Sequence, residues 1–332
     1  MNDKIKKIAN QSLQNEAISR EDALHLMQID GDEIYTLFYW ANQIRLRYFD
    51  HSVKVCSIVS AKQGRCTEDC RFCSQSAHYH TGIEEFPVID TNKIVGVANC
   101  AEKTGSSSLG IVTSGYSISN PEDLDKICKS IKAIVENTHI QPHGSFGMLT
   151  KEMAEALVKC GLKRLNHNLE TSERFFPNIC STHSFVDRVN TIRIAKEAGL
   201  EVCSGAIFGI GEGVEDRIDL AFTLKNLSVD VIPLNFLHPI SGTPLGNCTP
   251  LMPMEALKII SIFRFVLPDK EIKIAGGRES SLRDLQSWMF YAGANSTMIG
   301  NYLTTKGRKV EEDLQMIKDL KLEVSDENRS SV

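Results

Sequence analysis

The sequence lacks long apolar segments, an excess of basic residues and internal repeats. No apolar run in its 332 residues approaches the roughly 18 residues that would cross a bilayer, and the N-terminal segment MNDKIKKIANQSLQNE is too polar for a signal peptide. The formal net charge is −5, from 37 basic and 42 acidic residues that are interspersed. This balance indicates no nucleic-acid and no membrane partner. We therefore expect a cytoplasmic protein that acts on a small molecule.

The ten cysteines lack the arrangement of a four-thiolate metal site. In a reducing compartment we expect them to be thiols, metal ligands or core residues rather than disulfides. Three of them fall in the segment CTEDCRFC, as Cys66, Cys70 and Cys73, and the chain has no second Cys-x-x-Cys pair. Structural zinc and electron-storing [4Fe–4S] clusters usually take four protein ligands. The motif is one ligand short of both.

Three thiolates would leave one iron of a [4Fe–4S] cluster without a protein ligand. An open coordination position on a metal is a place where substrate binds, so the motif predicts a cluster that takes part in catalysis. The alternatives are three thiols clustered by chance, or a zinc knuckle completed by His78 or His80. In those cases the protein would be a cluster-binding or zinc-binding structural protein and not an enzyme.

Short strand-like runs alternate with amphipathic segments along most of the chain. Eight such strand–helix units predict a parallel sheet closed into a (β/α)8 barrel of the TIM type, with a doubly wound open sheet as the alternative. The predicted strands are 52–60, 107–115, 139–147, 162–170, 200–209, 230–239, 271–279 and 295–301. The predicted helices that follow them are 91–103, 121–137, 151–160, 185–198, 214–227, 254–266, 282–291 and 310–320.

Regions on either side of the barrel are predicted from different signals. Residues 1–48 form an N-terminal helical extension, with one helix capped by Ser19 and a second that begins near Asp32. The barrel occupies residues 49–322. Residues 323–332, which include the polar segment SDENRSSV, are predicted to be a disordered tail.

The motif CTEDCRFC, placed after the first strand, resembles the CxxxCxxC signature of the radical S-adenosylmethionine (SAM) family. A second signature of that family, GxIxGxxE, is matched after the fifth strand by Gly205, Ile207, Gly209 and Glu212. The resemblance implies that the open iron chelates the amino and carboxylate groups of SAM. It also implies that an electron from the cluster cleaves SAM to methionine and a 5′-deoxyadenosyl radical.

Polar residues share one face of several predicted strands. Side chains alternate along a strand, so Asn166, Asn168 and Glu170 lie together, and Arg278 lies on the face of Gly276. Barrel interiors are ordinarily filled by branched apolar side chains, and buried polar groups are costly without partners. A polar lining therefore predicts a polar guest, with a self-satisfied hydrogen-bond network as the alternative.

The segments NHNLETS, VCSGAIFGIGE, LNFL…GTPL and AGGRE resemble those of the biotin synthases, and the resemblance extends over about residues 18–322. Members of this family insert sulfur between two saturated carbons of dethiobiotin. The resemblance implies a sulfurtransferase that takes dethiobiotin as substrate, SAM and a [4Fe–4S] cluster as cofactors, and flavodoxin or ferredoxin as electron donor. It also implies a homodimer.

The same resemblance implies roles for single residues. Glu170 contacts SAM, and Asn168 contacts both SAM and the ureido group of dethiobiotin. Phe72 lies against the adenine or is an ordinary packed aromatic residue. The other residues placed at SAM are Ser114, Gly115 and Ile207, and those placed at the substrate are Asn166 and Asn235.

In this family the inserted sulfur comes from an auxiliary [2Fe–2S] cluster held by three cysteines and one arginine. Cys203 and Arg278 match two of these catalytic ligands, whereas the other two positions hold Gly110 and His143. Cys56, on the first strand, and His143 are the candidate replacement ligands, and the alternatives are a core thiol and a satisfied interior histidine. The altered ligand set leaves two cluster types open, [2Fe–2S] and a four-iron cluster with an extra sulfide.

Cys180, in the loop that follows NHNLETS, is a further candidate ligand, but a loop thiol is the preferred interpretation. The other cysteines are interpreted as packing residues, since Cys248 lies in a loop rich in glycine and proline, and Cys100, Cys128 and Cys160 fall on helices. Two classes of enzyme remain open. One is a biotin synthase with an altered auxiliary cluster, and the other is a radical SAM mutase or cofactor-maturation enzyme that does not insert sulfur.

Overall fold

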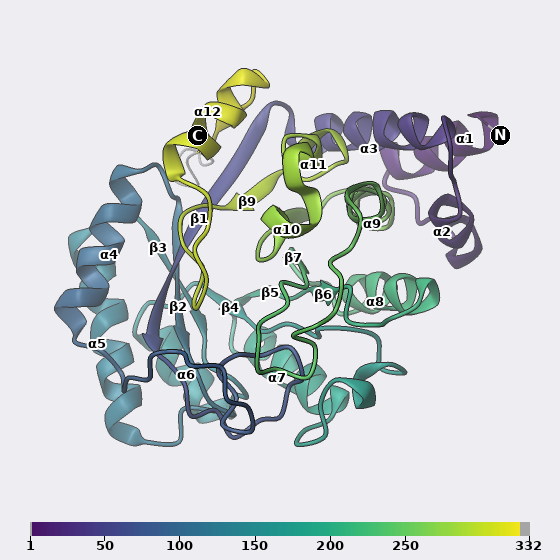
Figure 1. Cartoon of the computed structure of the whole chain (residues 1–332). Helices are drawn as coiled ribbons and strands as arrows, with labels where there is room; N and C mark the ends of the chain where they lie inside the picture. Colours follow the sequence, from purple (N-terminus) through teal and green to yellow (C-terminus); the bar gives the residue numbers. More distant parts are fainter. Residues whose placement is uncertain (1, 326–332) are drawn as a thin grey trace.

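Parallel strands form one sheet that closes on itself in the computed structural model, which describes residues 2–325 (Figure 1). Strand β1 (Ser52–Lys62) pairs with β2 (Ser108–Thr113) on one side and with β9 (Ser296–Met298) on the other. This double pairing leaves no open edge in the wall of the barrel. The predicted (β/α)8 barrel is confirmed, and the open sheet is excluded.

Nine strands form the wall within residues 2–325, but they occupy eight positions around the barrel. The short strands β5 and β6 share one position, because both pair with β7. The order around the barrel is β1, β2, β3, β4, β5 with β6, β7, β8 and β9. The remaining strands of the wall are β3 (Gln141–Ser145), β4 (Arg164–Asn166), β5 (Glu201–Cys203), β6 (Ala206–Phe208), β7 (Val231–Phe236) and β8 (Glu271–Ile274).

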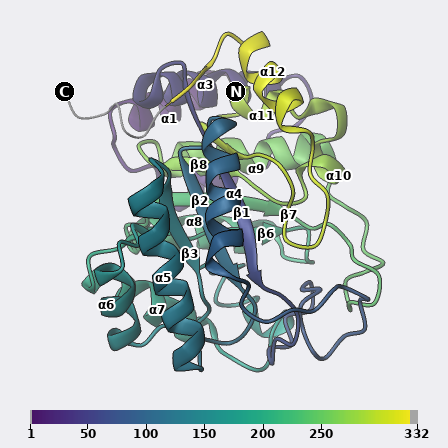
Figure 2. The same cartoon turned by 90° about the vertical axis from the view of Figure 1, so that its left-hand side faces the viewer.

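Helices cover the outside of the barrel, and Figure 2 shows α4 and α5 side by side on one flank. They are α4 (Thr91–Lys103), α5 (Pro121–Asn137), α6 (Lys151–Lys159), α7 (Phe185–Glu197), α8 (Val214–Asn226), α9 (Pro253–Val266) and α12 (Val310–Asp319). Each of these agrees with its predicted range to within one residue. The first four begin where the side chain of Asp90, Asn120, Thr150 or Ser184 accepts a hydrogen bond from the first turn.

Alternation along the strands separates an apolar shell from a polar interior. In β8, Ile272 and Ile274 are fully buried in the apolar core. Glu271 and Lys273, at the alternate positions, are also buried and form an ion pair with 3.5 Å between the ammonium and a carboxylate oxygen. Since side chains two apart share a face, Glu271 and Lys273 point into the barrel.

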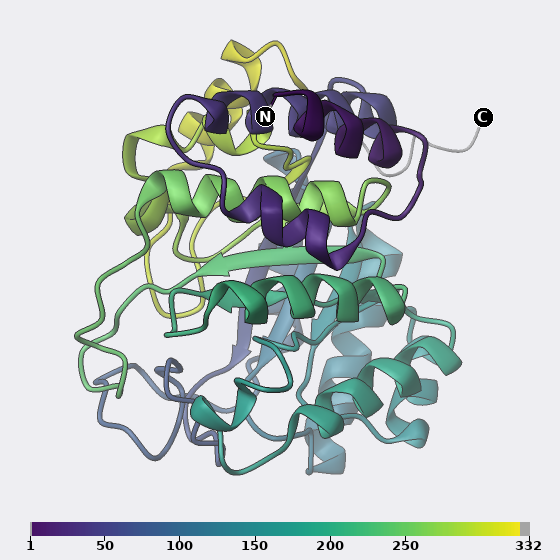
Figure 3. The ribbon, with the colours of Figure 1, turned by 90° about the vertical axis from the view of Figure 1, so that its right-hand side faces the viewer.

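Three helices precede β1 and pack against α8 and α9, as Figure 3 shows. They are α1 (Asn2–Leu13), α2 (Arg20–Met27) and α3 (Glu33–Phe49). The cap predicted at Ser19 is confirmed, because its side chain accepts a hydrogen bond from the Asp22 amide at 3.0 Å. The sequence prediction missed α1. Within residues 2–325, no helix is both long and apolar enough to span a bilayer.

Two predicted boundaries near the C-terminus were wrong. The helix predicted at 282–291 is split into α10 (Arg278–Leu282), a 3₁₀ turn (Arg283–Leu285) and α11 (Trp288–Tyr291). The split occurs because Arg283 takes a positive φ of 51°. The tail predicted to begin at residue 323 instead starts with a short strand, β10 (Glu323–Val324), which pairs with the start of β1. The rest of the predicted tail, 326–332, lies outside the described residues.

Gly277 joins β8 to α10 and provides a test of this connection. Its φ is 78°, and a Cβ atom would lie 1.8 Å from the carbonyl oxygen of Phe236. We expect Gly277→Ala to lower the free energy of unfolding by at least about 3 kcal/mol, from left-handed strain plus overpacking. In the control Gly105→Ala, where φ is 83° and no atom lies within 4 Å, the loss should be about 1 kcal/mol. Equal losses in urea denaturation would contradict the steric argument.

Candidate active site

The loop that follows β1 places three thiols at the carboxyl end of the barrel. Hydrogen bonds within the loop shape it, with the Cys66 amide donating to the Gln75 carbonyl at 3.0 Å and the Cys73 amide to the Cys70 carbonyl at 2.9 Å. All three cysteines line one cavity of about 260 Å³. In the described part of the chain, their sulfurs do not group within 4.8 Å of one another, as the ligands of a single ion would. The wider spacing suits ligands of separate irons in a cluster.

The zinc knuckle is not supported by the positions of the nearby histidines. Nε2 of His78 lies 2.9 Å from the carbonyl oxygen of Thr67. Among the described residues that line the cavity, neither His78 nor His80 appears. Burial raises the pKa of the Cys66 thiol and, to about 11, that of Cys73. Thiols of this kind become ligands when a metal compensates the charge of the thiolate.

Glu170 is held in a strained backbone conformation at the end of the fourth strand segment. Its φ is 70°, and its amide and carbonyl hydrogen-bond Gly205 and Ile207 across to the next strand, at 3.0 and 2.9 Å. Burial raises the pKa of its carboxyl group, and the guanidinium of Arg188, 3.5 Å away, opposes that rise. Such strain persists where the surrounding structure enforces it, which is common at functional sites.

A second cavity, of about 290 Å³, adjoins the cavity of the three cysteines. Both are lined by Phe72, Asn168 and Glu170. Of the other predicted SAM and substrate residues, Ser114, Gly115 and Asn166 line the first cavity, and Ile207 and Asn235 line the second. The structure therefore brings every residue of the predicted SAM and substrate sets to these two cavities.

The two asparagines predicted at the substrate differ in their partners. The amide of Asn235 donates to the Ala206 carbonyl at 3.0 Å and accepts from the Gly276 amide at 2.9 Å, which fixes its orientation. The side-chain oxygen of Asn166 is buried and has no hydrogen-bond partner among the described residues. A buried acceptor without a partner is costly, so Asn166 is a position at which a polar guest would lower the energy of the site.

The floor of the barrel holds two thiols and several charged groups. The positive charge of the Lys273 ammonium acts electrostatically on both the Cys56 and the Cys203 thiols. Burial raises the pKa of Cys56 and, to about 11, that of Cys203, whereas Lys273 opposes both shifts. For Glu271 burial is outweighed by Lys273 and Arg164, which lower its pKa to about 2. The floor thus contains charged groups gathered around the two thiols.

His143 is a neutral imidazole in the same interior. Burial, together with the positive charges of Arg164, Lys273 and Lys54, lowers its pKa well below the ordinary value. Its Nε2 atom is buried and has no hydrogen-bond partner among the described residues. A neutral imidazole nitrogen with no partner is available as a metal ligand. Gly110 provides no ligand, and a Cβ at that position would approach the side chains of Ile58 and Asn166.

The predicted position of Arg278 on a strand was wrong. Strand β8 ends at Ile274, and Arg278 is the first residue of α10, after the left-handed Gly277. Its guanidinium pairs with the buried carboxylate of Asp313 in α12 and lies against the Tyr302 hydroxyl at 3.4 Å. This contact connects α10 to α12. The cations that act on Cys56 and Cys203 are Lys273 and Arg164.

Two residues of the site, Arg188 and Lys273, were missed from the sequence, and a third, Cys180, was named but interpreted as a loop thiol. Arg188 of α7 lines the three-cysteine cavity and donates to the Asn168 carbonyl at 2.8 Å. Lys273 could have been found, because the apolar alternates Ile272 and Ile274 in EIKI require it to face inward. Cys180, interpreted as a loop thiol, is buried with its sulfur 3.9 Å from that of Cys70. No spacing in the sequence reveals that contact.

Comparison with known proteins gives two matching family models. Residues 61–224 match the radical SAM superfamily, and residues 233–323 match the biotin and thiamin synthesis associated domain. Biotin synthase from Geotalea daltonii is 50% identical over 97% of this chain and 98% of its own length. Biotin synthase from Geobacter sulfurreducens is 48% identical over 96% of each chain. The chain belongs to the biotin synthase family.

Solved structures of similar fold include a synthase and a maturase. Methylornithine synthase superposes with a TM-score of 0.85 at 18% identity, covering 96% of this chain and 97% of that one. The FeFe-hydrogenase maturase HydG from Carboxydothermus hydrogenoformans gives a TM-score of 0.81 at 17% identity, covering 97% of this chain and 79% of that one. At these identities the likeness establishes the fold alone.

The Arg278–Asp313 pair gives a test of whether Arg278 has a structural role. We expect Arg278→Met to cost about 3–5 kcal/mol of unfolding free energy, because it leaves the fully buried Asp313 carboxylate with only the more distant Arg308, at 3.8 Å, as a cationic partner. The double variant Arg278→Met/Asp313→Leu should recover most of that loss, since neither charge remains buried. Iron and sulfide contents of reconstituted protein should match those of wild type. If Arg278→Met loses iron but keeps its stability, Arg278 is a ligand of the auxiliary cluster and not a structural residue.

Proposed function

We infer that this chain converts dethiobiotin to biotin by radical SAM-dependent insertion of sulfur. The inference of this activity rests on similarity to biotin synthases over nearly the whole chain. The observation from the structure that supports it best is the pair of adjoining cavities that share Phe72, Asn168 and Glu170. When bound, the [4Fe–4S] cluster supplies the electron that cleaves SAM. No observation favours a mutase or a maturation enzyme.

The chain's own residues bind and orient SAM in the first cavity. Cys66, Cys70 and Cys73 provide thiolates for three irons and leave the fourth to the cofactor. Arg188 contributes a cation and Glu170 a carboxylate, and these groups match the carboxylate and the ribose hydroxyls of SAM. The strained backbone of Glu170 fixes its carboxylate before the ligand arrives.

The second cavity suits the ureido ring of dethiobiotin. A ureido group has one acceptor and two donors, and side-chain amides can pair with both kinds of group. In the second cavity Asn235 is fixed by its backbone contacts, and Asn168 lines both cavities. Asn166, whose side-chain oxygen has no partner among the described residues, lines the first cavity, so the ring would have to reach the shared wall to contact it. Ile207 contributes apolar surface for the saturated carbons.

We propose that the floor of the barrel holds the auxiliary iron–sulfur cluster. Cys56 and Cys203 provide thiolates, and the unpartnered Nε2 of His143 provides a third ligand. Lys273 contributes a positive charge that acts on both thiols. Its ammonium donates hydrogen bonds and offsets the negative charge of a sulfide-rich cluster. Two thiolates are fewer than a standard [2Fe–2S] ligand set, which is consistent with a four-iron cluster with an extra sulfide.

The remaining assignments rest on the family. We propose that the protein works in the cytoplasm as a homodimer and that flavodoxin or ferredoxin delivers the electron. Size-exclusion chromatography with light scattering tests the dimer. Reduction of the anaerobic enzyme by each purified donor tests the electron source.

Glu170 provides a test of the SAM site. If its carboxylate accepts hydrogen bonds from the ribose hydroxyls, Glu170→Gln should weaken SAM binding by about 1.5–3 kcal/mol without changing the thermal midpoint. The matched control is Glu173→Gln, because Glu173 is exposed and lies outside the cavity. Isothermal titration calorimetry on the anaerobic holoprotein measures both. Equal affinities in wild type and Glu170→Gln would place the ribose elsewhere.

The floor of the barrel provides the test of sulfur insertion. Cys56→Ala should remove the auxiliary cluster, spare SAM cleavage and abolish biotin formation, because the ligands of the outer cluster are untouched. Lys273→Met should lower the auxiliary iron content, and Lys273→Arg should restore part of it. The readouts are iron and sulfide counts, Mössbauer spectra, 5′-deoxyadenosine and biotin, with the exposed Cys100→Ala as control.

Each outcome of that experiment has a defined meaning. If Cys56→Ala keeps its full iron content and makes biotin, Cys56 is a core residue and the ligand assignment fails. If wild type holds one cluster, cleaves SAM and makes no biotin, the sulfur-insertion function fails. Cys70→Ala should lose both SAM cleavage and biotin, because it removes one of three ligands of the radical cluster.

A further inference from the structure

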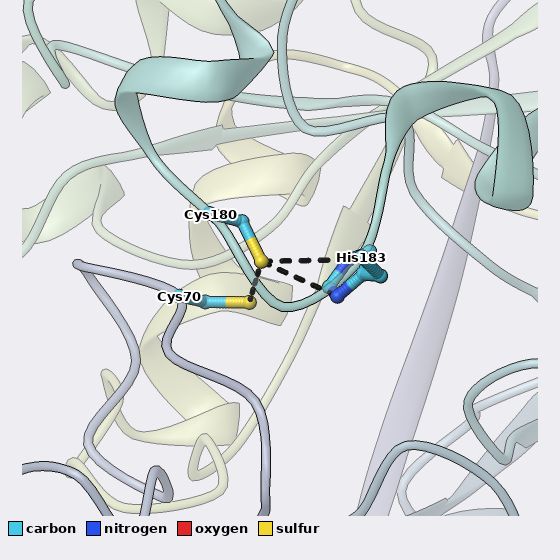
Figure 4. A group of neighbouring side chains, drawn as sticks. All are labelled: Cys70, Cys180 and His183. Carbon is cyan, nitrogen blue, oxygen red and sulfur yellow. Dashed lines mark hydrogen bonds between the residues drawn. The ribbon is translucent and has the colours of Figure 1, made fainter.

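Cys70, Cys180 and His183 bring three metal-binding atoms together, although they come from loops more than a hundred residues apart (Figure 4). The two sulfurs are 3.9 Å apart, and the Cys180 sulfur lies 3.3 Å from Nδ1 and 3.8 Å from Nε2 of His183. The ligand atoms of these three side chains all lie within 4.8 Å of one another. Among the histidine, cysteine, aspartate and glutamate side chains of residues 2–325, no other group of three or more does so.

These distances are those of ligands on one tetrahedral ion. Two thiolates bound to zinc lie about 3.8 Å apart, and a thiolate and an imidazole nitrogen lie about 3.6 Å apart, given metal–ligand bonds of about 2.3 and 2.0–2.1 Å. The observed sulfur–sulfur distance of 3.9 Å is close to the first value. The observed sulfur–nitrogen distances of 3.3 and 3.8 Å lie on either side of the second value. The three residues therefore require little rearrangement to enclose an ion.

Two carboxylates and one cation surround Cys180 and His183, and the Arg188 guanidinium donates to Nε2 of His183 at 3.0 Å, which leaves Nδ1 as the ligand nitrogen. A carboxylate oxygen of Asp69 lies 3.2 Å from the Cys180 sulfur, and one of Glu68 lies 2.5 Å from Nδ1 of His183. One thiol can donate only one proton, yet the Cys180 sulfur lies within hydrogen-bond distance of Cys70, Asp69 and His183. Carboxylates beside ligating groups orient them and offset the charge of the metal.

We propose that Cys70, Cys180 and His183 form a mononuclear site for a thiophilic divalent cation, Zn²⁺ or Fe²⁺, in the protein before its radical cluster is assembled. Binding displaces the protons of the two thiols to solvent, and the metal forms bonds to two thiolate sulfurs and one imidazole nitrogen. Cys70 cannot serve this site and the [4Fe–4S] cluster together. The ion and the cluster are therefore mutually exclusive, and the site competes with cluster assembly.

The test removes the other two motif thiols so that they cannot bind the probe ion. We compare Cys66→Ala/Cys73→Ala with the triple variant that also carries Cys180→Ala, both cluster-free, anaerobic and under reductant. Titration with Co²⁺ should give one equivalent in the double variant, with sulfur-to-cobalt charge-transfer absorption, that the triple variant lacks, since any ion bound at Cys56, Cys203 and His143 appears in both. The triple variant should bind at least about 100-fold more weakly, which exceeds the 10–100-fold cost of losing an outer partner of a metal. Zn²⁺ should displace the cobalt.

The control is Cys100→Ala on the same double background, because Cys100 is exposed on α4. It should leave Co²⁺ affinity unchanged. Equal binding in the double and triple variants, or an equal loss with Cys100→Ala, would overturn the proposal. If the triple variant fails to fold by circular dichroism, Cys180→Ser and His183→Phe on the same background replace it.

A second measurement uses chains that keep all three motif cysteines. Stoichiometric Zn²⁺ should slow reconstitution of the radical cluster in wild type at least about tenfold more than in Cys180→Ala, with the cluster followed by its absorption. Equal inhibition in the two proteins would overturn the competition. Neither measurement depends on biotin formation, so these results are independent of the proposed sulfur-insertion activity.

Discussion

Pairing of β1 with both β2 and β9 is the contact on which the site depends. Closure gives the interior a fixed volume and leaves its inward side chains no access to bulk water except at the ends. The same strand carries Cys56 inside the barrel and leads at its carboxyl end into the loop of Cys66, Cys70 and Cys73. One strand thus positions both the proposed floor of the site and its mouth.

Closure also explains why the interior charges occur together. Glu271, Lys273 and Arg164 are buried, and a buried charge without a partner would be far more costly than one paired with an opposite charge. Lys273 lies beside Glu271 and two thiols, and Arg164 pairs with Glu201 at 2.6 Å. The positive charges of Lys273 and Arg164 are already compensated by Glu271 and Glu201. They would interact still more favourably with an anionic, sulfide-rich cluster bound between the thiols.

Local signals predicted the barrel and most of the cavity lining, because caps, alternation and the cysteine motif act within a few residues. They placed α4 to α9 to within a residue and brought Asn168 and Glu170 to the site. They failed for Arg278, because the turn at Gly277 ends β8 earlier than the composition of EIKIAGGRE indicates. They failed for Cys180 because its contact with Cys70 is produced by tertiary packing of two distant loops.

The two cavities share a wall that is built from different parts of the chain. Phe72 comes from the loop after β1, whereas Asn168 and Glu170 follow β4, and all three line both cavities. Glu170 is in turn hydrogen-bonded to Gly205 and Ile207 at β6. A radical that must meet a saturated carbon needs the two ligands at a fixed separation, since a misplacement of about 1 Å can cost a hundredfold in rate. The backbone hydrogen bonds of Glu170 to Gly205 and Ile207 fix one wall that the two cavities share, which suits the constant separation that the proposed reaction requires.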